Sequence, residues 1–281
     1  MEVTHRQRFD YIVRIPNFLG TQPSDPPMSA SGEENEYVMG LEKGLTIIEA
    51  FGIRRSPLTL SEVAGIAGHS KASVRRCLLT LVKLGYARLD GRHFSLSPRA
   101  LRLGHAFVSS NPLTRVAQPI LELTSERTQE SSSLAVLDSQ DVVFIARYTH
   151  RRSLSFGLGV GSRLPAYCSA TGRVLLSAKP VADVSFILNR MTRPALTPMT
   201  ITSVSRIQKE IGIAREQGYA QVDEELEIGL RSIAVPVRDA SGRMVAALSL
   251  AVATDRISRG DVVTRLLPEL ESARRALSQL L

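Results

Sequence analysis

Apolar residues recur every three or four positions from residue 40 onward, which predicts a helix with one buried face. These positions are Leu41, Leu45, Ile48 and Phe51. Gly52 follows the last of them and ends the predicted helix. Further on, Thr59-Leu60-Ser61-Glu62 has the spacing of a capping box, in which the Thr hydroxyl and the Glu carboxylate each bind a backbone N–H group. This segment predicts a second, short helix, which Gly68 ends.

A third helix is predicted after a short connection, with Ser70 as its N-cap. Gly85 ends this helix, and Asp90-Gly91 predicts a tight turn between two short strands, residues 86–89 and 93–96. Two short helices joined by a small turn and followed by a hairpin predict a winged helix-turn-helix unit. The inward positions of the third helix are Val74, Leu78 and Leu81, and its outward positions include Lys71, Ser73, Arg75, Arg76 and Thr80.

Positive charge is concentrated in this part of the chain. The 281 residues include 35 Lys and Arg against 27 Asp and Glu, a formal net charge of +8. Residues 37–105 hold 11 basic and 4 acidic residues, a net of +7, whereas residues 1–36 have a net of −3 and residues 106–281 a net of +4. Duplex DNA favours such a local excess, because each neutralised phosphate releases condensed counterions.

The positions predicted to contact DNA lie on the third helix and on the hairpin. The second helix of a helix-turn-helix pair enters the ~12 Å major groove, and a wing reaches the flanking backbone. A small three-helix protein-interaction module with a solvated basic helix is the alternative interpretation. The predicted DNA contacts are Ser70, Lys71, Ser73, Arg75 and Arg76 on the helix, and Arg88 and Arg92 on the hairpin.

Beyond the winged unit the chain alternates strands and helices. The predicted strands are residues 132–137, 142–148, 153–160, 233–237 and 244–253, and the predicted helices are 172–178, 181–189, 204–217 and a last one capped by Ser258. An antiparallel sheet with helices on both sides belongs to the α+β class. The predicted segments are a disordered tail (1–36), the winged unit (37–96), a linker helix opened by Ser97-Pro98 (97–111) and a second domain (112–281).

Nothing in the chain is typical of a membrane or secreted protein. No stretch without a charged residue exceeds 12 residues, short of the ~20 that a membrane helix needs, and the N-terminus lacks an apolar signal-peptide core. Two cysteines, Cys77 and Cys168, are too few for a disulfide scaffold. We therefore expect a cytoplasmic protein. We also expect a natural start at Met28 or Met39, which a measured mass of the native N-terminus would test.

The chemistry available in residues 106–281 is limited. They contain no G-x-S-x-G, H-E-x-x-H or C-x-x-C motif, so the sequence predicts neither an enzyme nor a bound cofactor or metal. The acidic residues 223–227 could chelate a hard cation, although a solvated loop is the simpler interpretation. Cys168 is either a thiol nucleophile or a small packed side chain.

A segment suited to a small anion runs from Gly161 to Arg173. Small residues at 169–172 leave the start of the predicted helix open, so its backbone N–H groups and positive dipole end could receive a carboxylate. Tight helix packing through the same small residues is the alternative.

Several motifs of the second domain recur in one known family. They are Leu164-Pro165, Ala170, Gly172-Arg173, Asp223-Glu224-Glu225, Gly229-Leu230-Arg231, Ala234 and Pro236. With the winged unit they resemble the IclR family of bacterial transcriptional regulators, over roughly residues 38–281. Phe144-Ile145-Ala146-Arg147 and the segments 164–167 and 172–176 resemble the branch that governs aromatic-acid catabolism. Members of that branch respond to protocatechuate, p-hydroxybenzoate or β-ketoadipate pathway compounds.

The resemblance implies a GAF-like effector domain with a pocket over its sheet. Because such relatives bind small organic acids, a basic partner is expected, and Arg147, Arg152 and Arg163 are the candidates. The predicted effector-binding residues are Arg163, Ala170, Thr171, Leu230, Ser232, Ser249 and Ala251.

The sequence therefore predicts a DNA-binding regulator controlled by a small aromatic or dicarboxylic acid. We expect a homodimer or homotetramer that reads a pseudo-palindromic operator, with RNA polymerase as a further partner if the protein activates transcription. The linker helix and the helix after Pro112 would supply apolar faces for dimerisation. Two alternatives are a GAF-like enzyme that uses Cys168 and a ligand-free DNA-architectural protein.

Overall fold

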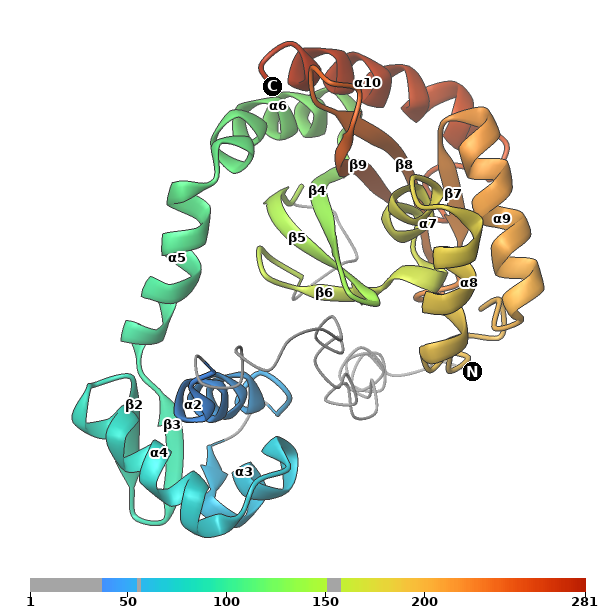
Figure 1. Cartoon of the computed structure of the whole chain (residues 1–281). Helices are drawn as coiled ribbons and strands as arrows, with labels where there is room; N and C mark the ends of the chain where they lie inside the picture. The colour runs from blue at the N-terminus through green and yellow to red at the C-terminus, as the bar shows by residue number, and fades with distance from the viewer. Residues whose placement is uncertain (1–36, 55–56, 151–157) are drawn as a thin grey trace. The chain divides into compact units, whose positions relative to one another are not determined.

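The computed structural model describes residues 37–54, 57–150 and 158–281 (Figure 1). The chain divides into two compact units between Ala106 and Phe107. The predicted tail, residues 1–36, lies outside the described residues, as does Arg152.

The first unit is a winged helix-turn-helix, as predicted. Its three helices pack around one small apolar core that includes Ile47, Val63, Val74 and Leu78. Strand β1 pairs with β3 through Leu58, an additional strand that the sequence pattern did not predict. In chain order the elements are α2 (Met39–Ala50), β1 (Leu58–Thr59), α3 (Leu60–Ala67), α4 (Lys71–Lys83), β2 (Ala87–Asp90) and β3 (His93–Leu96).

The predicted caps set the ends of these helices. The Thr59 N–H donates to Glu62 Oε2 at 2.8 Å, and the Glu62 N–H donates to Thr59 Oγ1 at 3.4 Å, which completes the capping box. Gly68 ends α3 at φ 68°, a left-handed conformation that glycine adopts without strain. The Ser70 hydroxyl accepts from the N–H of Ser73 at the start of α4. These caps place α3 and α4 in the two positions of a helix-turn-helix pair.

The predicted linker helix begins as a short 3-10 helix and continues as an α-helix. Ser97 caps a 3-10 helix, Pro98–Ala100, and α5 follows as Leu101–Ser110. No residue of α5 is buried. Helix α6 (Pro112–Thr128) begins directly afterwards, with Asn111 as its N-cap.

The second unit contains a six-stranded antiparallel sheet in the order β6-β5-β4-β9-β8-β7. The short strands β6 and β7 were not predicted. Most of the predicted strand 153–160 lies outside the described residues, and residues 158–160 form no strand. The strands are β4 (Ser131–Asp138), β5 (Asp141–Tyr148), β6 (Arg163–Pro165), β7 (Ala220–Asp223), β8 (Leu230–Arg238) and β9 (Met244–Ala253).

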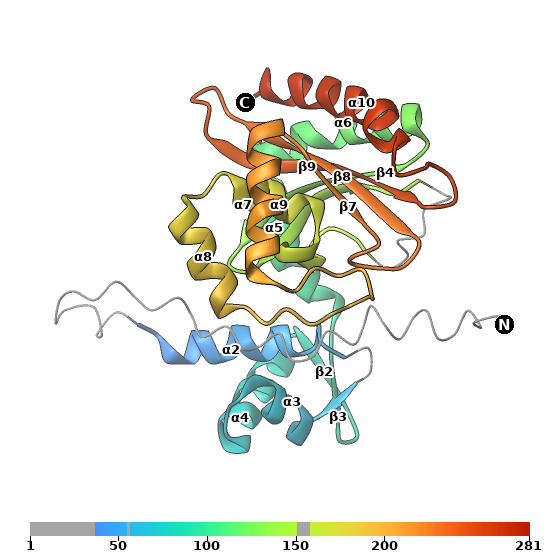
Figure 2. The ribbon, with the colours of Figure 1, turned by 90° about the vertical axis from the view of Figure 1, so that its right-hand side faces the viewer.

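Helices cover both faces of this sheet, so the α+β prediction is confirmed (Figure 2). One apolar core lies between the sheet and the pair α6 and α10, and a second lies between the sheet and the layer formed by α7, α8 and α9. The remaining helices are η3 (Ala166–Cys168), α7 (Ala170–Ser177), α8 (Val181–Arg190), α9 (Val204–Gln217) and α10 (Asp261–Ser278). Helix α10 starts at Asp261, whose N–H donates to the hydroxyl of Ser258. None of the helices described is both long and apolar enough to cross a bilayer.

A buried carboxylate lies where α6 joins β4. Glu130 is 2% exposed, and Arg256 Nη1 lies 3.0 Å from its Oε1. Burial raises the pKa of Glu130 to about 7, although the neighbouring charges of Arg256 and Arg265 oppose the rise. Because the pKa in the folded chain exceeds the ordinary value of 4.5, the charged form destabilises the fold. The stability that the neutral form provides is therefore lost as pH rises from about 4.5 through about 7.

We expect Glu130→Gln to reduce the pH dependence of stability between pH 5 and pH 8. The neutral amide cannot acquire the buried charge, which costs up to about 1.4 kcal/mol per pH unit in that window. Thermal unfolding of both proteins across this range would measure the difference. Parallel Tm curves for the two proteins would contradict the assignment.

Candidate functional site

A cavity lies between α7 and the sheet of the second unit. Its volume is about 40 Å³. Strands β4, β5, β8 and β9 form its floor, and α7 and the loop between β7 and β8 contribute its walls. The lining residues are Ser133, Phe144, Arg147, Leu158, Leu164, Ser169, Ala170, Thr171, Val222, Leu226, Leu230, Ser232, Ser249 and Ala251.

A β-bulge in β5 brings Arg147 to this cavity. Successive residues of a regular strand alternate between faces, so Phe144 and Arg147 would lie on opposite sides of the sheet. The register shifts between Leu134, which pairs with Ala146, and Ala135, which pairs with Phe144. Ile145 is therefore the extra residue of the bulge, and Arg147 joins Phe144 on the cavity side.

Arg147 is held by neutral groups. Its Nη1 donates to Ser133 Oγ at 2.8 Å, its Nε donates to Thr149 Oγ1 at 3.2 Å, and its guanidinium carbon lies 5.2 Å from the centre of the Phe144 ring. The residue is 9% exposed, and Nη2 has no hydrogen-bond partner among the described atoms.

The charge of Arg147 also has no counter-ion within the described part of the chain. No Asp or Glu there forms an ion pair with it. Burial lowers the pKa of Arg147, yet a guanidinium remains charged in proteins. A buried, unpaired cation is costly. An anion in the cavity would relieve that cost and could accept hydrogen bonds from the free N–H groups of Arg147.

The rest of the lining combines hydroxyl groups with apolar surface. Hydroxyls are contributed by Ser133, Ser169, Thr171, Ser232 and Ser249, and the larger apolar side chains are Phe144, Leu158, Leu164, Val222, Leu226 and Leu230. Small-molecule sites typically have this composition, with a few polar groups that orient an apolar ligand body. The chemistry of the cavity therefore suits a small molecule with one acidic group and an apolar skeleton.

The structure brings most of the predicted effector-binding residues to this one cavity, but not Arg163. The Arg163 guanidinium lies instead against Asp138 at 2.6 Å and Asp141 at 3.1 Å, so its charge is already neutralised. Among the described residues that line the cavity, the basic one is Arg147, another of the three candidates. The predicted residues that line the cavity are Ala170, Thr171, Leu230, Ser232, Ser249 and Ala251.

The start of α7 is closely packed. Ser169 caps the helix, and its hydroxyl accepts from the N–H of Gly172 at 3.2 Å. A Cβ atom on Gly172 would lie 2.2 Å from the carbonyl oxygen of Ala166. Tight packing through small residues therefore explains Gly172, whereas Ala170 and Thr171 border the cavity.

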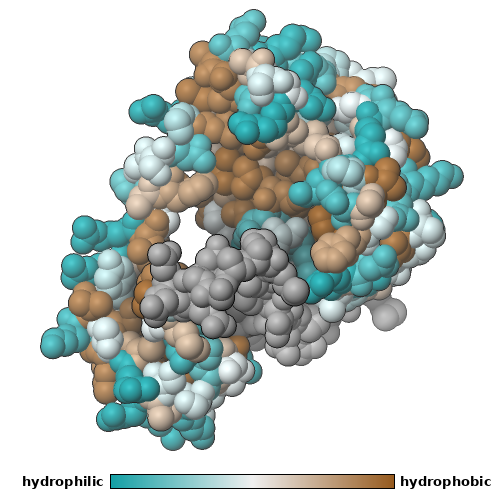
Figure 3. Space-filling view, in the orientation of Figure 1, coloured by the Kyte–Doolittle hydropathy of each residue, from teal (hydrophilic) through white to brown (hydrophobic). Residues whose placement is uncertain are grey.

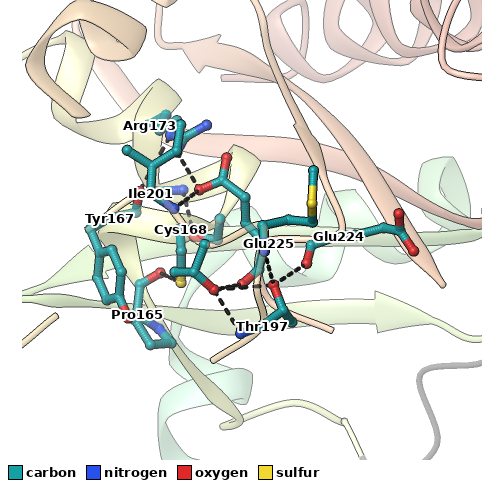
Figure 4. Close-up of polar contacts among 12 residues, drawn as sticks. Pro165, Tyr167, Cys168, Arg173, Thr197, Ile201, Glu224 and Glu225 are labelled. Atoms are coloured by element: carbon teal, nitrogen blue, oxygen red, sulfur yellow. Dashed lines mark hydrogen bonds and ion pairs between the residues drawn. The ribbon is translucent and has the colours of Figure 1, made fainter. Parts of the chain in front are cut away.

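A buried ion pair fixes the wall of the cavity that carries Leu226 (Figure 4). Arg173 on α7 donates from Nη2 to Glu225 Oε2 at 2.8 Å, and both side chains are almost fully buried. The N–H of Ile201 donates to the same carboxylate oxygen at 3.0 Å. These contacts hold the loop between β7 and β8 against α7.

The acidic residues of that loop are engaged in protein contacts. Asp223 pairs with Arg231 at 2.5 Å, and Glu224 Oε1 accepts from the N–H of Gly229 at 2.7 Å. No group of three potential metal ligands occurs among the residues described. The contacts thus favour a structural role for this loop over chelation of a cation.

Cys168 does not have the environment of a nucleophile. Its side chain is fully buried, and burial raises the pKa of the thiol to about 12. The thiol is therefore protonated at neutral pH, whereas nucleophilic chemistry requires the thiolate. This geometry favours the packed side chain over the thiol enzyme.

Basic side chains are exposed on the winged unit. Lys71, Arg75 and Arg76 lie on the exposed surface of α4, and Arg88 and Arg92 lie on the β2–β3 hairpin. None of these five pairs with a carboxylate within the described ranges. Ser70 is exposed and Ser73 is half-buried.

Comparison with known proteins identifies both units. Residues 40–91 match the IclR helix-turn-helix domain, and residues 105–279 match the bacterial transcriptional regulator IclR C-terminal domain. The chain belongs to the IclR family. The predicted family is thereby confirmed, and the winged unit is its DNA-binding domain.

Similar IclR-family proteins regulate the catabolism of aromatic acids, as predicted. The chain is 43% identical to the Pca regulon regulatory protein of Pseudomonas putida, over 86% of this chain and 84% of that protein. It is 36% identical to the p-hydroxybenzoate hydroxylase transcriptional activator of Acinetobacter baylyi, over 91% and 96% respectively. These relatives are transcriptional regulators, so the chain is a regulator and not an enzyme.

A solved IclR homologue from Microbacterium hydrocarbonoxydans, in complex with 4-hydroxybenzoate, has a related fold. Its TM-score is 0.71 at 25% identity, and the match covers 86% of this chain and 98% of that one.

We expect Gly172→Ala to destabilise this IclR-family protein by about 1–3 kcal/mol, because the added methyl group would collide with the Ala166 backbone. Gly212→Ala on α9 is the matched control, since a Cβ there has open space. It should stabilise the helix by roughly 0.5–1 kcal/mol. Denaturant unfolding measures both changes, and equal stabilities of the two variants would refute the packing argument.

Proposed function

We propose that a small aromatic carboxylic acid binds in the cavity and controls the DNA binding or activity of this transcriptional regulator. The observation that carries the proposal is the buried guanidinium of Arg147, which lines the cavity with a free Nη2 and no ion-pair partner within the described residues. A carboxylate matches its planar, two-pronged geometry.

The apolar lining favours an aromatic ring. With its carboxylate on Arg147, the ligand would place its ring against Phe144 and the leucines of the opposite wall. A ring hydroxyl would find a partner in Ser232 or Ser249. The name of the Acinetobacter baylyi relative and the 4-hydroxybenzoate complex of the Microbacterium homologue support a ligand of this class.

Binding of such a ligand requires the cavity to expand. Its present volume is about 40 Å³, whereas a cavity that binds benzene measures roughly 150 Å³. The ligand therefore binds better to an expanded arrangement than to the present one. This difference in affinity is what allows a ligand to shift a protein between two states.

We expect Arg147→Met to weaken binding of 4-hydroxybenzoate at least about tenfold, because it removes a charged hydrogen-bond donor of the carboxylate. Isothermal titration calorimetry with 4-hydroxybenzoate, protocatechuate and β-ketoadipate measures the affinities. Arg163→Met is the matched control and should bind as the parent does, because Arg163 lies outside the cavity.

An unchanged affinity in Arg147→Met would overturn the assignment of the carboxylate to this residue. If the protein bound only β-ketoadipate, its ligand would be a dicarboxylate and not an aromatic acid.

On the winged unit, the proposed groove contacts are Lys71, Ser73, Arg75 and Arg76, and the proposed wing contacts are Arg88 and Arg92. Ser70 would lie near phosphate at the start of α4. The unpaired charge of these basic side chains supports the assignment, because phosphates can neutralise it without competition from protein carboxylates.

We expect Arg75→Ala to weaken binding to DNA that the parent protein selects from random duplexes, by about 1–3 kcal/mol for a base contact. Gel-shift titration at fixed salt measures the affinity. Arg206→Ala, an exposed arginine of α9, is the control. Equal DNA affinity of Arg75→Ala and the parent would reject the contact, and unchanged 4-hydroxybenzoate affinity would show that the fold is intact.

The linker favours assembly with a second copy. Leu101, Leu103 and Phe107 of α5 are exposed, Phe107 by 47%, and Figure 3 shows hydrophobic surface on this helix. A ten-residue helix without buried residues is marginal in water alone. A second copy of α5 would cover this helix in a homodimer. The molar mass measured in solution would distinguish a homodimer from a monomer or a homotetramer.

RNA polymerase would be a further partner if the protein activates transcription.

A further inference from the structure

We infer that α6 relays occupation of the cavity to the linker helix α5, with the Thr114 hydroxyl as the joint between the two helices. The inference rests on the proposed function, since it names the route by which a ligand on Arg147 would act on α5. Three sets of contacts carry it.

The first contact is between the cavity floor and α6. Ser133 and Ser132 are neighbours on β4, so their side chains lie on opposite faces of the sheet. Ser133 lines the cavity and holds Arg147, whereas Ser132 is buried against α6. The Ser132 hydroxyl donates to the carbonyl oxygen of Leu121 at 2.8 Å, and its N–H donates to the Ser125 hydroxyl at 3.1 Å.

The second contact reaches the ligand-binding residue itself. Gln118 on α6 donates from Nε2 to the carbonyl oxygen of Arg147 at 3.5 Å. The same residue thus presents its side chain to the cavity and its backbone to α6. A shift of the β5 backbone at Arg147 would therefore act on α6 through this hydrogen bond.

The third contact joins α6 to α5. Thr114, in the first turn of α6, is 3% exposed, and its hydroxyl lies 2.7 Å from the carbonyl oxygen of Val108 on α5. It lies 2.8 Å from the carbonyl oxygen of Asn111, the N-cap of α6. The hydroxyl therefore spans the break between the helices and fixes the last turn of α5 to the first turn of α6.

These contacts allow a ligand to act at a distance because the intervening parts are close-packed. The cavity must expand to admit a ring. Ser132 of β4 and Ser125 of α6 are fully buried and hydrogen-bonded to each other, so a movement of β4 acts on α6. The displacement then passes through α6 as a unit and is transferred at Thr114. From there α5 continues along the chain toward the winged unit.

Hydrogen–deuterium exchange of the full-length protein, with and without saturating 4-hydroxybenzoate, tests the route. In the parent protein we expect the ligand to change exchange in β4, β5 and α5, with rates in α5 altered at least about fivefold. In Thr114→Val, which keeps the side-chain shape and removes the hydroxyl, we expect the response in β4 and β5 to remain and the response in α5 to disappear.

Thr124→Val is the matched control. Thr124 is equally buried on α6, but its hydroxyl donates at 2.7 Å to Ile120 of its own helix. Thr124→Val should keep the ligand-dependent change in exchange of α5. It therefore separates the general effect of losing a buried hydroxyl from the loss of the Thr114 contact between α6 and α5. An α5 response that persists in Thr114→Val would overturn the inference.

The parent protein separates this inference from the proposed function. No ligand-dependent change anywhere, the cavity strands included, would refute both. A change in β4 and β5 without any change in α5 would refute the relay while leaving ligand binding in place.

Discussion

The placement of Arg147 depends on one irregularity, the bulge at Ile145 in β5. Without the extra residue, the strict alternation of a strand would direct Arg147 into the core beneath α6 and α10, where no anion could reach it. With it, the guanidinium shares a face with Phe144 and lies beside Ser133. Bulges re-aim side chains in this way next to functional sites, and here the bulge converts a sheet surface into a charged cavity.

Two buried arginines of the second unit differ in whether a carboxylate pairs with them. Arg173 is paired with Glu225, and the pair secures a loop against α7. Arg147 has hydroxyl partners but no counter-ion within the described residues. The paired residue holds the β7–β8 loop against α7, and the unpaired one gives the floor of the cavity a positive charge that no described carboxylate neutralises.

Local patterns predicted the winged unit well because its determinants are local. The Thr59–Glu62 capping box, the glycine at position 68 and the Ser70 cap act within a few residues, and each appears in the structure as expected. The small strands were harder to predict. β1 and β7 have two and four residues, too few for a clear alternation of apolar and polar positions. β1 exists through pairing with β3, which follows beyond α3, α4 and β2, whereas β7 pairs with the next strand, β8. For the cavity, the family resemblance predicted six of the residues that line it, whereas the predicted Arg163 lies outside the cavity, paired with Asp138.

Sequence patterns were enough to predict the helices and the long strands β4, β5, β8 and β9, the concentration of positive charge in residues 37–105 and the resemblance to a regulator family. These follow from periodicity, caps, composition and motifs, all of which are properties of the linear chain. The fold was needed to show which buried arginine of the second unit has no counter-ion among the described residues. That choice depends on the register between β4 and β5 and on which carboxylates lie within reach. Asp138 and Asp141 neutralise Arg163, whereas the bulge carries Arg147 to a face where the described residues offer it only hydroxyl groups and an aromatic ring.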